Sequence, residues 1–351
     1  MPGSTGLAVD PSAAADARFN ALALELFAAQ FAAVAPYAAW CRSLRRTPAE
    51  VTRWEEIPAL PTSAFKAWGI TGLPAGEIIQ TFQSSGTTRQ ERSRHHHGSG
   101  SLPVYQRTSR AWFRQQARRE VQPVRLVSLT PAPSEVPQSS LVHMLAHVTL
   151  PGEPATEWLG GDSSDGWVLE PEKVRSARER ISAEGRPVWI AGTAFNFVHD
   201  LDRRSTGLPP LPPGSIVMET GGYKGRSREL SRDELHAGIA RSWGVPRSHV
   251  ITEYGMCELS SQGYRWSAPL AGEAPAPLAL PPWARVRIVS PETLDEVPEG
   301  SVGMIRWFDL ANVGSVLAVQ TEDLGRRVAG GFELLGRGAG AEPRGCSLLA
   351  A

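Results

Sequence analysis

The sequence predicts an α/β protein whose larger part is built on mostly parallel strands and whose smaller part is a short antiparallel sheet. From residue 107 to residue 254, helix and strand patterns alternate, which is typical of parallel strands joined by helices. From about residue 284 onward, only short strands separated by Pro and Gly turns follow, and this indicates antiparallel pairing. A linker rich in Pro and Ala, residues 271–282, separates the two patterns.

Most elements have a local signal of their own. Residues 13–34 carry an apolar stripe at helical spacing, which predicts a helix. Thr47 and Glu50 form a capping box, which predicts that a second helix begins after Thr47. The helices expected after these are 107–120, 171–184, one directly after Gly192, and one from Ser231 to Trp243. The strands expected are 124–130, 188–191, 215–218, 250–252, 286–289, 304–308 and 316–320.

The bulk composition excludes several classes of protein. The chain has 351 residues, of which 36 are basic and 36 acidic, so charge gives no reason to expect a nucleic acid as partner. Its three cysteines, Cys41, Cys257 and Cys346, are far apart and lack metal-ligand spacing, which argues against a disulfide framework and favours the cytoplasm. Charged and polar residues interrupt the apolar stretch 21–39, so we expect no transmembrane segment.

Residues 84–88, Ser-Ser-Gly-Thr-Thr, form the first of five segments with residue types suited to a nucleotide. The glycine lets the backbone approach a ligand, and the hydroxyl and N–H groups can donate to phosphate oxygens. The segment lacks the lysine of a P-loop. By itself it is equally compatible with a polar surface turn.

Two further segments follow predicted strands. Gly221 and Gly222 would let a flat ligand lie against the backbone. In the next segment, Tyr254 and Gly255 precede Glu258, so an aromatic ring could stack on a base while a carboxylate binds Mg²⁺ together with ATP. Taken singly, the first would be a tight turn, and the second a core tyrosine with a solvated glutamate.

The last two segments are expected in loops, and the first of them directly follows a predicted strand. A carboxylate at Asp323 can accept both hydroxyls of a ribose, and the guanidinium of Arg337 can contact a phosphate or a ribose. Either could be an ordinary turn residue.

In their order and spacing the five segments resemble the adenylate-forming superfamily, which includes acyl-CoA synthetases and peptide-synthetase adenylation domains. The resemblance implies ATP and Mg²⁺ as cofactors, with Glu258 as the magnesium ligand and with catalytic roles for Glu258 and Thr87. The ATP-binding residues that it implies are Ser84, Ser85, Gly86, Thr87, Thr88, Gly221, Gly222, Tyr254, Gly255, Asp323 and Arg337.

The chain resembles one branch more closely, the acyl-protein synthetases of the bacterial bioluminescence fatty-acid reductase complex, with the phenylacetate-CoA ligases as neighbours. The resemblance is carried by residues 57–66, 82–88, 221–224 and 344–347. It implies that a carboxylic acid, expected to be a fatty acid, is activated as an acyl-adenylate and transferred to a thiol. Cys346 is the acceptor implied by position, and an acyl reductase, an acyltransferase or a carrier protein is the expected partner.

The resemblance also implies three regions. Residues 1–270 would be the α/β region that binds nucleotide and acyl group, residues 283–335 a β subdomain of the same core, and residues 336–351 a Gly-rich tail with Cys346. We expect the C-terminal lid domain of the superfamily to be absent. Cys257 is expected to be a buried neighbour of the nucleotide, and Phe195 and Phe197 to contribute to the acyl pocket.

Four histidines are left open by the sequence. One of His95, His96 and His97 would lie near the phosphates, and His143 near the acyl or phosphate site or in a structural position. Neighbouring histidines in an extended run point in different directions, so the triplet does not predict a metal site. Two other functions also stay open: an acid–CoA or carrier-protein ligase, and a nucleotide-binding subunit without catalysis.

Overall fold

The computed structural model describes residues 13–84, 92–116, 124–163, 166–202, 207–221, 230–268 and 276–338. Its helices are α1 (Ala13–Ala33), α2 (Ala35–Ser43), α3 (Ala64–Ala67), α4 (Ser101–Gln116), α5 (Ser140–His147), α6 (Pro171–Glu184), α7 (Ala194–Asp202) and α8 (Arg232–Trp243), with short 3₁₀ turns η1 (Trp54–Glu56), η2 (Ala75–Glu77) and η4 (Arg247–His249). Within these residues no single helix is long and apolar enough to cross a membrane, and only the pair α1 and α2, bent by 109°, meets the length and composition of a span.

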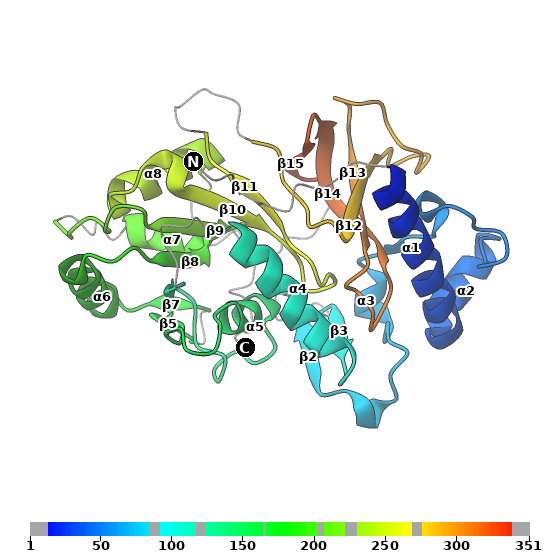
Figure 1. The fold of residues 1–351 in the computed structure, drawn as a ribbon, viewed down its shortest axis with the longest axis horizontal. Coiled ribbons are helices and arrows are strands. Elements are labelled where there is room, and N and C mark those ends of the chain that lie inside the picture. Colours follow the sequence, from blue (N-terminus) through cyan, green and yellow to red (C-terminus); the bar gives the residue numbers. More distant parts are fainter. Residues whose placement is uncertain are drawn as a thin grey trace.

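A six-stranded sheet forms one half of the molecule, with the order β11-β10-β9-β8-β4-β5 (Figure 1). Its strands are β4 (Leu126–Ser128), β5 (Glu157–Trp158), β8 (Trp189–Thr193), β9 (Ile216–Thr220), β10 (Val250–Tyr254) and β11 (Gly263–Trp266). All neighbours pair in parallel except β11, which is antiparallel to β10. The mostly parallel sheet predicted from the helix and strand rhythm is therefore confirmed.

Helices cover both faces of this sheet, which explains why every residue of β8, β9 and β10 is buried. On one face, α4 and α5 pack through a core that includes Phe113 and Leu145. On the other face, α6, α7 and α8 pack through a core that includes Ile181, Phe197 and Trp243. Side chains along a strand alternate between these two cores.

Helix ends with complete capping signals were predicted correctly. Helix α6 spans 171–184 as expected, and its C-cap Gly185 has φ 66°, a left-handed conformation that glycine adopts without strain. Helix α8 is preceded by Ser231, whose side chain and that of Glu234 form the predicted capping box, and it ends before Gly244 with φ 67°.

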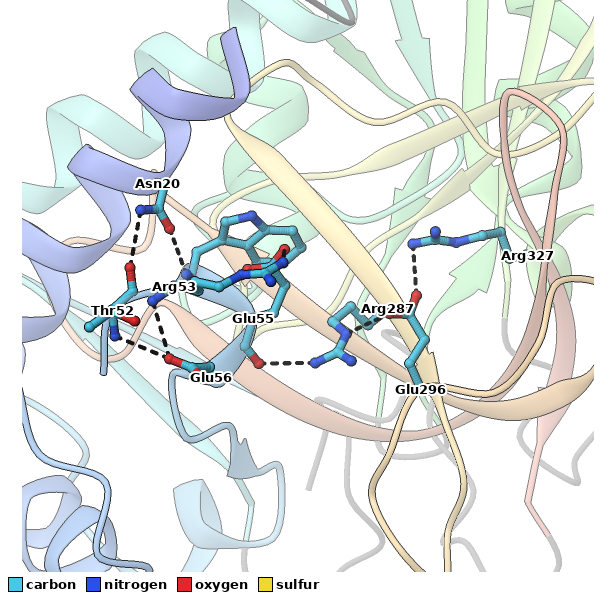
Figure 2. Close-up of polar contacts among 9 residues, drawn as sticks. Asn20, Thr52, Arg53, Glu55, Glu56, Arg287, Glu296 and Arg327 are labelled. Carbon is cyan, nitrogen blue, oxygen red and sulfur yellow. Dashed lines mark hydrogen bonds and ion pairs between the residues drawn. The ribbon is translucent and has the colours of Figure 1, made fainter. Parts of the chain in front are cut away.

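The predicted helix after Thr47 is wrong. The N–H of Thr47 donates to Glu50 Oε2 at 2.7 Å as in a capping box, but residues 48–50 make a single turn. Figure 2 shows the reason: the Glu56 carboxylate accepts the N–H groups of Thr52 and Arg53, so side chains take up the donors that a helix would need. Helix α4 differs as well, since it begins at Ser101 rather than at residue 107.

The second sheet has the order β1-β14-β13-β12, and β15 pairs with residues 323–328 of β14, after the residues that pair with β1. Its strands are β1 (Leu60–Pro61), β12 (Ala284–Val289), β13 (Val302–Asp309), β14 (Ala318–Val328) and β15 (Gly331–Arg337). The two-stranded ribbons β2 (Gln80–Gln83) with β3 (Arg94–His97), and β6 (Gly160–Gly161) with β7 (Val168–Leu169), are antiparallel. Strands β12 to β15 pair antiparallel, as predicted for the C-terminal part.

The N-terminal helices belong to the half of the molecule that holds the second sheet (Figure 1). Strand β1 pairs in parallel with β14, and one core joins Phe27 and Tyr37 of the helices to Trp307 and Val319 of the sheet. Strands β13 and β14 therefore pack against the helices α1 and α2, although nearly 300 positions separate them in the sequence. The boundaries expected at residues 270, 283 and 335 stay a prediction.

Polar contacts accompany this packing (Figure 2). Asn20 of α1 donates to Thr52 O at 3.3 Å and accepts the Trp54 N–H at 2.7 Å. Arg287 of β12 donates to Glu55 O at 3.0 Å. Because half-exposed contacts of this kind contribute at most about 1 kcal/mol each, the shared apolar core accounts for most of the attachment.

Candidate active site

A cavity of about 240 Å³ lies at the C-terminal ends of β9 and β10, where ligands are typically bound in parallel sheets. The second sheet, the end of β2 and the helices α4 and α5 complete its wall. The described lining residues are Gln83, Ser84, Tyr105, Ser139, Ser140, Leu141, Met144, Thr220, Gly221, Thr252, Glu253, Tyr254, Gly255, Met256, Cys257, Glu258, Gln262, Asp323, Leu334, Gly336 and Arg337.

The cavity brings together the described residues of all five predicted segments. These are Ser84, Gly221, Tyr254, Gly255, Glu258, Asp323 and Arg337. The remaining residues of the predicted site, Ser85, Gly86, Thr87, Thr88, Gly222 and Cys346, lie outside the described part of the chain. Segments that are up to about 250 positions apart in the sequence thus share one wall.

Asp323 is held by an aromatic hydroxyl and a guanidinium. The Tyr254 hydroxyl donates to Asp323 Oδ2 at 2.7 Å, and Arg337 Nε donates to Oδ1 at 3.2 Å. An ionised carboxylate offers about four acceptor positions, so two remain for hydroxyl groups of a ligand. The arrangement suits a diol such as a ribose.

The expectation that Asp323 and Arg337 lie in loops is wrong. Both are strand residues, and they face each other in the register of β14 and β15. Asp and Gly are depleted in strands, which is why this segment looks like a turn. Pairing with β13 and β15, with a register shift between Leu324 and Gly325, overrides that local preference.

Ser84 directly follows β2 and is bonded to Ser93, which directly precedes β3. Its Oγ accepts the Ser93 N–H at 2.9 Å, and its own N–H donates to Ser93 O at 3.0 Å. The hydroxyl hydrogen is not needed for the first of these bonds and can point elsewhere. The cavity wall therefore reaches the base of the Ser/Thr/Gly segment.

Glu258 is fully buried at the cavity wall, four residues after the end of β10. Two side chains hold the backbone on which it sits: Asn312 Nδ2 donates to Glu258 O at 3.0 Å, and His95 Nδ1 lies 2.7 Å from Cys257 O. Among the described residues, no three His, Cys, Asp or Glu side chains form a metal cluster. One carboxylate suits Mg²⁺ that is bound mainly through phosphates and water, so Glu258 fits that role.

His95 is a neutral, structural histidine. Because a carbonyl oxygen only accepts, Nδ1 carries the hydrogen that it donates to Cys257 O, and Nε2 accepts from the Ser315 hydroxyl at 3.1 Å. Burial lowers the pKa of His95 to about 4. The expected burial of Cys257 beside the site is confirmed, since Cys257 is 6% exposed and lines the cavity.

None of the other histidines in the described part of the chain lines the cavity either. His97 and His143 both pack against Phe82, and burial lowers their pKa values to about 2 and about 4. His96 points to the other face of β3, where Nδ1 lies 2.9 Å from Thr81 Oγ1. The alternation expected for a run of adjacent histidines is confirmed.

Phe195 and Phe197 are absent from the described wall of the cavity, contrary to the expectation for an acyl pocket. Phe197 packs against Trp243 in the core under α7 and α8. The apolar wall comes instead from Tyr105 of α4 and from Leu141 and Met144 of α5. The sequence signal was the Ser139 N-cap and the apolar spacing after it, since these place a short helix there.

Glu253 was also missed as a site residue. It is 5% exposed, lines the cavity and belongs to the same strand face as Ile251. Burial raises its pKa to about 7, a hydrogen bond from the Thr220 side chain lowers it, and the charge of Glu219 raises it. Its strand neighbour Tyr254 points to the opposite face, toward Asp323.

Known proteins resemble this chain in sequence or in fold. The family model of the acyl-protein synthetase, LuxE, matches residues 11–350. The long-chain-fatty-acid–luciferin-component ligase of Vibrio harveyi is 23% identical over 281 residues, which cover 77% of this chain and 69% of that protein.

Among solved structures, an open conformation of 2-hydroxyisobutyryl-CoA ligase with 2-HIB-AMP and CoA superimposes with a TM-score of 0.68 at 13% sequence identity. The aligned region covers 96% of this chain and 79% of the ligase chain. The postadenylation state of the same ligase has a TM-score of 0.66 at 13% sequence identity, and the aligned region covers 96% of this chain and 72% of the ligase chain. At these identities the likeness shows the fold, and it confirms the predicted α/β class. The match to the family model extends over nearly the whole chain: this protein belongs to the acyl-protein synthetase (LuxE) family.

Proposed function

We propose that this protein is an ATP-dependent ligase that converts a carboxylic acid into an acyl-adenylate and passes the acyl group to a thiol. Membership of the acyl-protein synthetase family supports this reaction. The observation that carries the proposal is the single cavity in which Gly221, Tyr254, Glu258, Asp323 and Arg337 meet.

In the first half-reaction the residues of this cavity bind and orient ATP. Asp323, held by Tyr254 and Arg337, accepts the ribose hydroxyls, and the ring of Tyr254 and the backbone at Gly221 lie against the adenine. Ser84 and the hydroxyls that follow it donate to the phosphates. Mg²⁺, bound at Glu258, would neutralise phosphate charge. A carboxylate oxygen of the acid then attacks the α-phosphorus, and pyrophosphate leaves as the α–β bridge breaks.

In the second half-reaction the acceptor is a thiol. A thiolate attacks the acyl carbonyl carbon, the bond to the AMP phosphate breaks, and a thioester forms. We propose Cys346 as this acceptor, on the basis of its position in the family pattern. An acyl reductase, an acyltransferase or a carrier protein in the cytoplasm would then receive the acyl group.

A fatty acid is the first candidate for the substrate. The name of the Vibrio harveyi relative specifies a long-chain fatty acid. The apolar residues Tyr105, Leu141 and Met144 offer a surface that suits an alkyl chain.

The test is ATP–pyrophosphate exchange that depends on an added carboxylic acid, run over a panel of acids. Asp323→Asn keeps the shape of the side chain but removes the charge paired with Arg337, and it should lower kcat/KM for ATP about 10- to 100-fold. The matched control is Glu296→Gln, a carboxylate that pairs with Arg287 and Arg327 outside the cavity. The absence of exchange with every acid would refute the proposal.

Product analysis separates the two ligase readings. With CoA present, an acyl-CoA product would identify a CoA ligase, whereas acyl label on the protein that disappears in Cys346→Ser would identify the acyl-protein route. ATP binding without exchange would indicate a nucleotide-binding subunit.

A further inference from the structure

The cavity has two ends that lie on opposite faces of β10. At the β14–β15 end, Tyr254 meets Asp323 and Arg337. At the α4–α5 end, the wall includes Tyr105, Leu141, Met144, Thr220, Glu253 and Gln262, beside Ser139 and Ser140 at the start of α5. If the nucleotide occupies the first end, as the proposed function requires, the body of the acid extends into the second.

The α4–α5 end combines an apolar wall with two buried polar side chains. Glu253 and Gln262 are each 5% exposed. They come close together at Gly255, where a Cβ would lie 2.5 Å from Glu253 Oε1 and 3.4 Å from Gln262 Cγ. Glycine at position 255 therefore leaves the space that the Glu253 carboxyl occupies.

The two polar side chains differ in how far the protein satisfies them. Gln262 Oε1 has no hydrogen-bond partner among the described residues. The Glu253 carboxyl has a hydrogen bond from Thr220, and burial and the nearby Glu219 oppose its ionisation. A buried polar group without a partner is costly, so each such group calls for a water molecule or a ligand atom beside it.

An unsubstituted alkyl chain would displace that water and replace none of its hydrogen bonds. A ligand group that donates to a carboxyl and an amide oxygen would replace them. Two buried acceptors beside an apolar wall thus favour a substrate that carries a donor there.

We propose that the acid activated by this enzyme bears a hydrogen-bond donor on its acyl part, a hydroxyl or an amino group, and that Glu253 and Gln262 bind this group. The inference rests on the proposed function and specifies its substrate class. It differs from the reading in which the acid is an unsubstituted fatty acid.

The experiment uses the full chain and sets of three acids of equal length: unsubstituted, hydroxylated and aminated at successive positions. The readout is kcat/KM in acid-dependent ATP–pyrophosphate exchange. We expect one substituted acid to exceed its unsubstituted counterpart at least about tenfold. Glu253→Leu and Gln262→Leu should bring this ratio close to one, whereas Glu296→Gln should leave it unchanged.

Glu253→Gln tells the two donors apart. A hydroxylated acid would keep most of its advantage, because an amide oxygen still accepts, whereas an aminated acid would lose the ionic partner of its ammonium. Equilibrium binding of the paired acids to the wild type provides a measurement that does not depend on the folding of any variant.

The inference would be overturned if an unsubstituted acid were both the best substrate and the tightest ligand, and if Glu253→Leu and Gln262→Leu left the kcat/KM ratio of substituted to unsubstituted acid unchanged. The proposed ligase activity would not be affected by that result. Loss of exchange with every acid would instead count against the proposed function.

Discussion

Replacement of Tyr254 by Phe isolates one hydrogen bond at the candidate active site. The substitution removes the hydroxyl that donates to Asp323 Oδ2 at 2.7 Å and keeps the ring. The ring contacts with Trp307 and Phe332, at 5.9 Å and 6.2 Å between centroids, should therefore persist. Any effect belongs to the hydroxyl.

The size of the effect follows from the burial of both partners. Tyr254 and Asp323 are each 8% exposed, and a hydrogen bond to a charged group contributes about 1.5–3 kcal/mol. Arg337 keeps its bond to Oδ1, so the carboxylate retains one partner. We expect the free energy of unfolding to fall by about 1.5–3 kcal/mol. With Asp323 less firmly held, the KM for ATP should rise.

Urea unfolding and acid-dependent exchange measure these two effects. The matched control is Tyr264→Phe, which also removes a buried tyrosine hydroxyl, but one whose bond is to the Met144 sulfur at 3.9 Å and is therefore weak. Tyr264→Phe should unfold close to the wild type. If Tyr254→Phe unfolds at the same urea concentration as the wild type and has an unchanged KM for ATP, the role assigned to this hydroxyl is refuted.

Four further predictions concern pH, metal and the acyl acceptor. Burial raises the pKa of Glu253 from 4.5 to about 7, so the folded protein keeps a proton that the unfolded chain releases. The stabilisation that this retained proton provides is full below pH 4.5, and it falls by about 3 kcal/mol as the pH rises to 7. Glu253→Gln lacks this ionisation, so its free energy of unfolding, measured by urea titration, should rise by about 3 kcal/mol relative to that of the wild type between pH 4.5 and pH 8. Burial lowers the pKa of His95 from 6.5 to about 4. As the pH falls from 6.5 to 4, the free energy of unfolding of the wild type should therefore decrease by up to about 3 kcal/mol more than that of His95→Gln. Equal decreases in the two proteins would contradict a buried, neutral imidazole at this position. Chelation of Mg²⁺ should abolish exchange, and Glu258→Gln should raise the Mg²⁺ concentration that gives half-maximal exchange. Cys346→Ser should keep exchange and lose protein-bound acyl label, and label that persists would exclude this acceptor.

Signals within a few residues determined much of the fold. The capping residues around α6 and α8 satisfy donors and acceptors at the ends of those helices, so their boundaries could be predicted. The alternation of helices and strands also predicted the parallel sheet, because parallel neighbours need a crossover between them. The same sheet places Gly221 and Glu258 at one edge, as the order of the segments suggested.

Contacts between distant segments decided the rest. Asp323 and Arg337 became facing strand residues because β14 pairs with β13 and β15, and Thr47 starts only a turn because Glu56 captures the next backbone donors. The environment of Glu253 depends on Thr220, which lies on the neighbouring strand of the sheet. Local propensities amount to fractions of a kcal/mol per residue, whereas strand pairing and burial involve many groups together. The sequence by itself therefore determined which residues are suited to bind a nucleotide, and the tertiary structure determined how they are held and which polar groups line the cavity beside them.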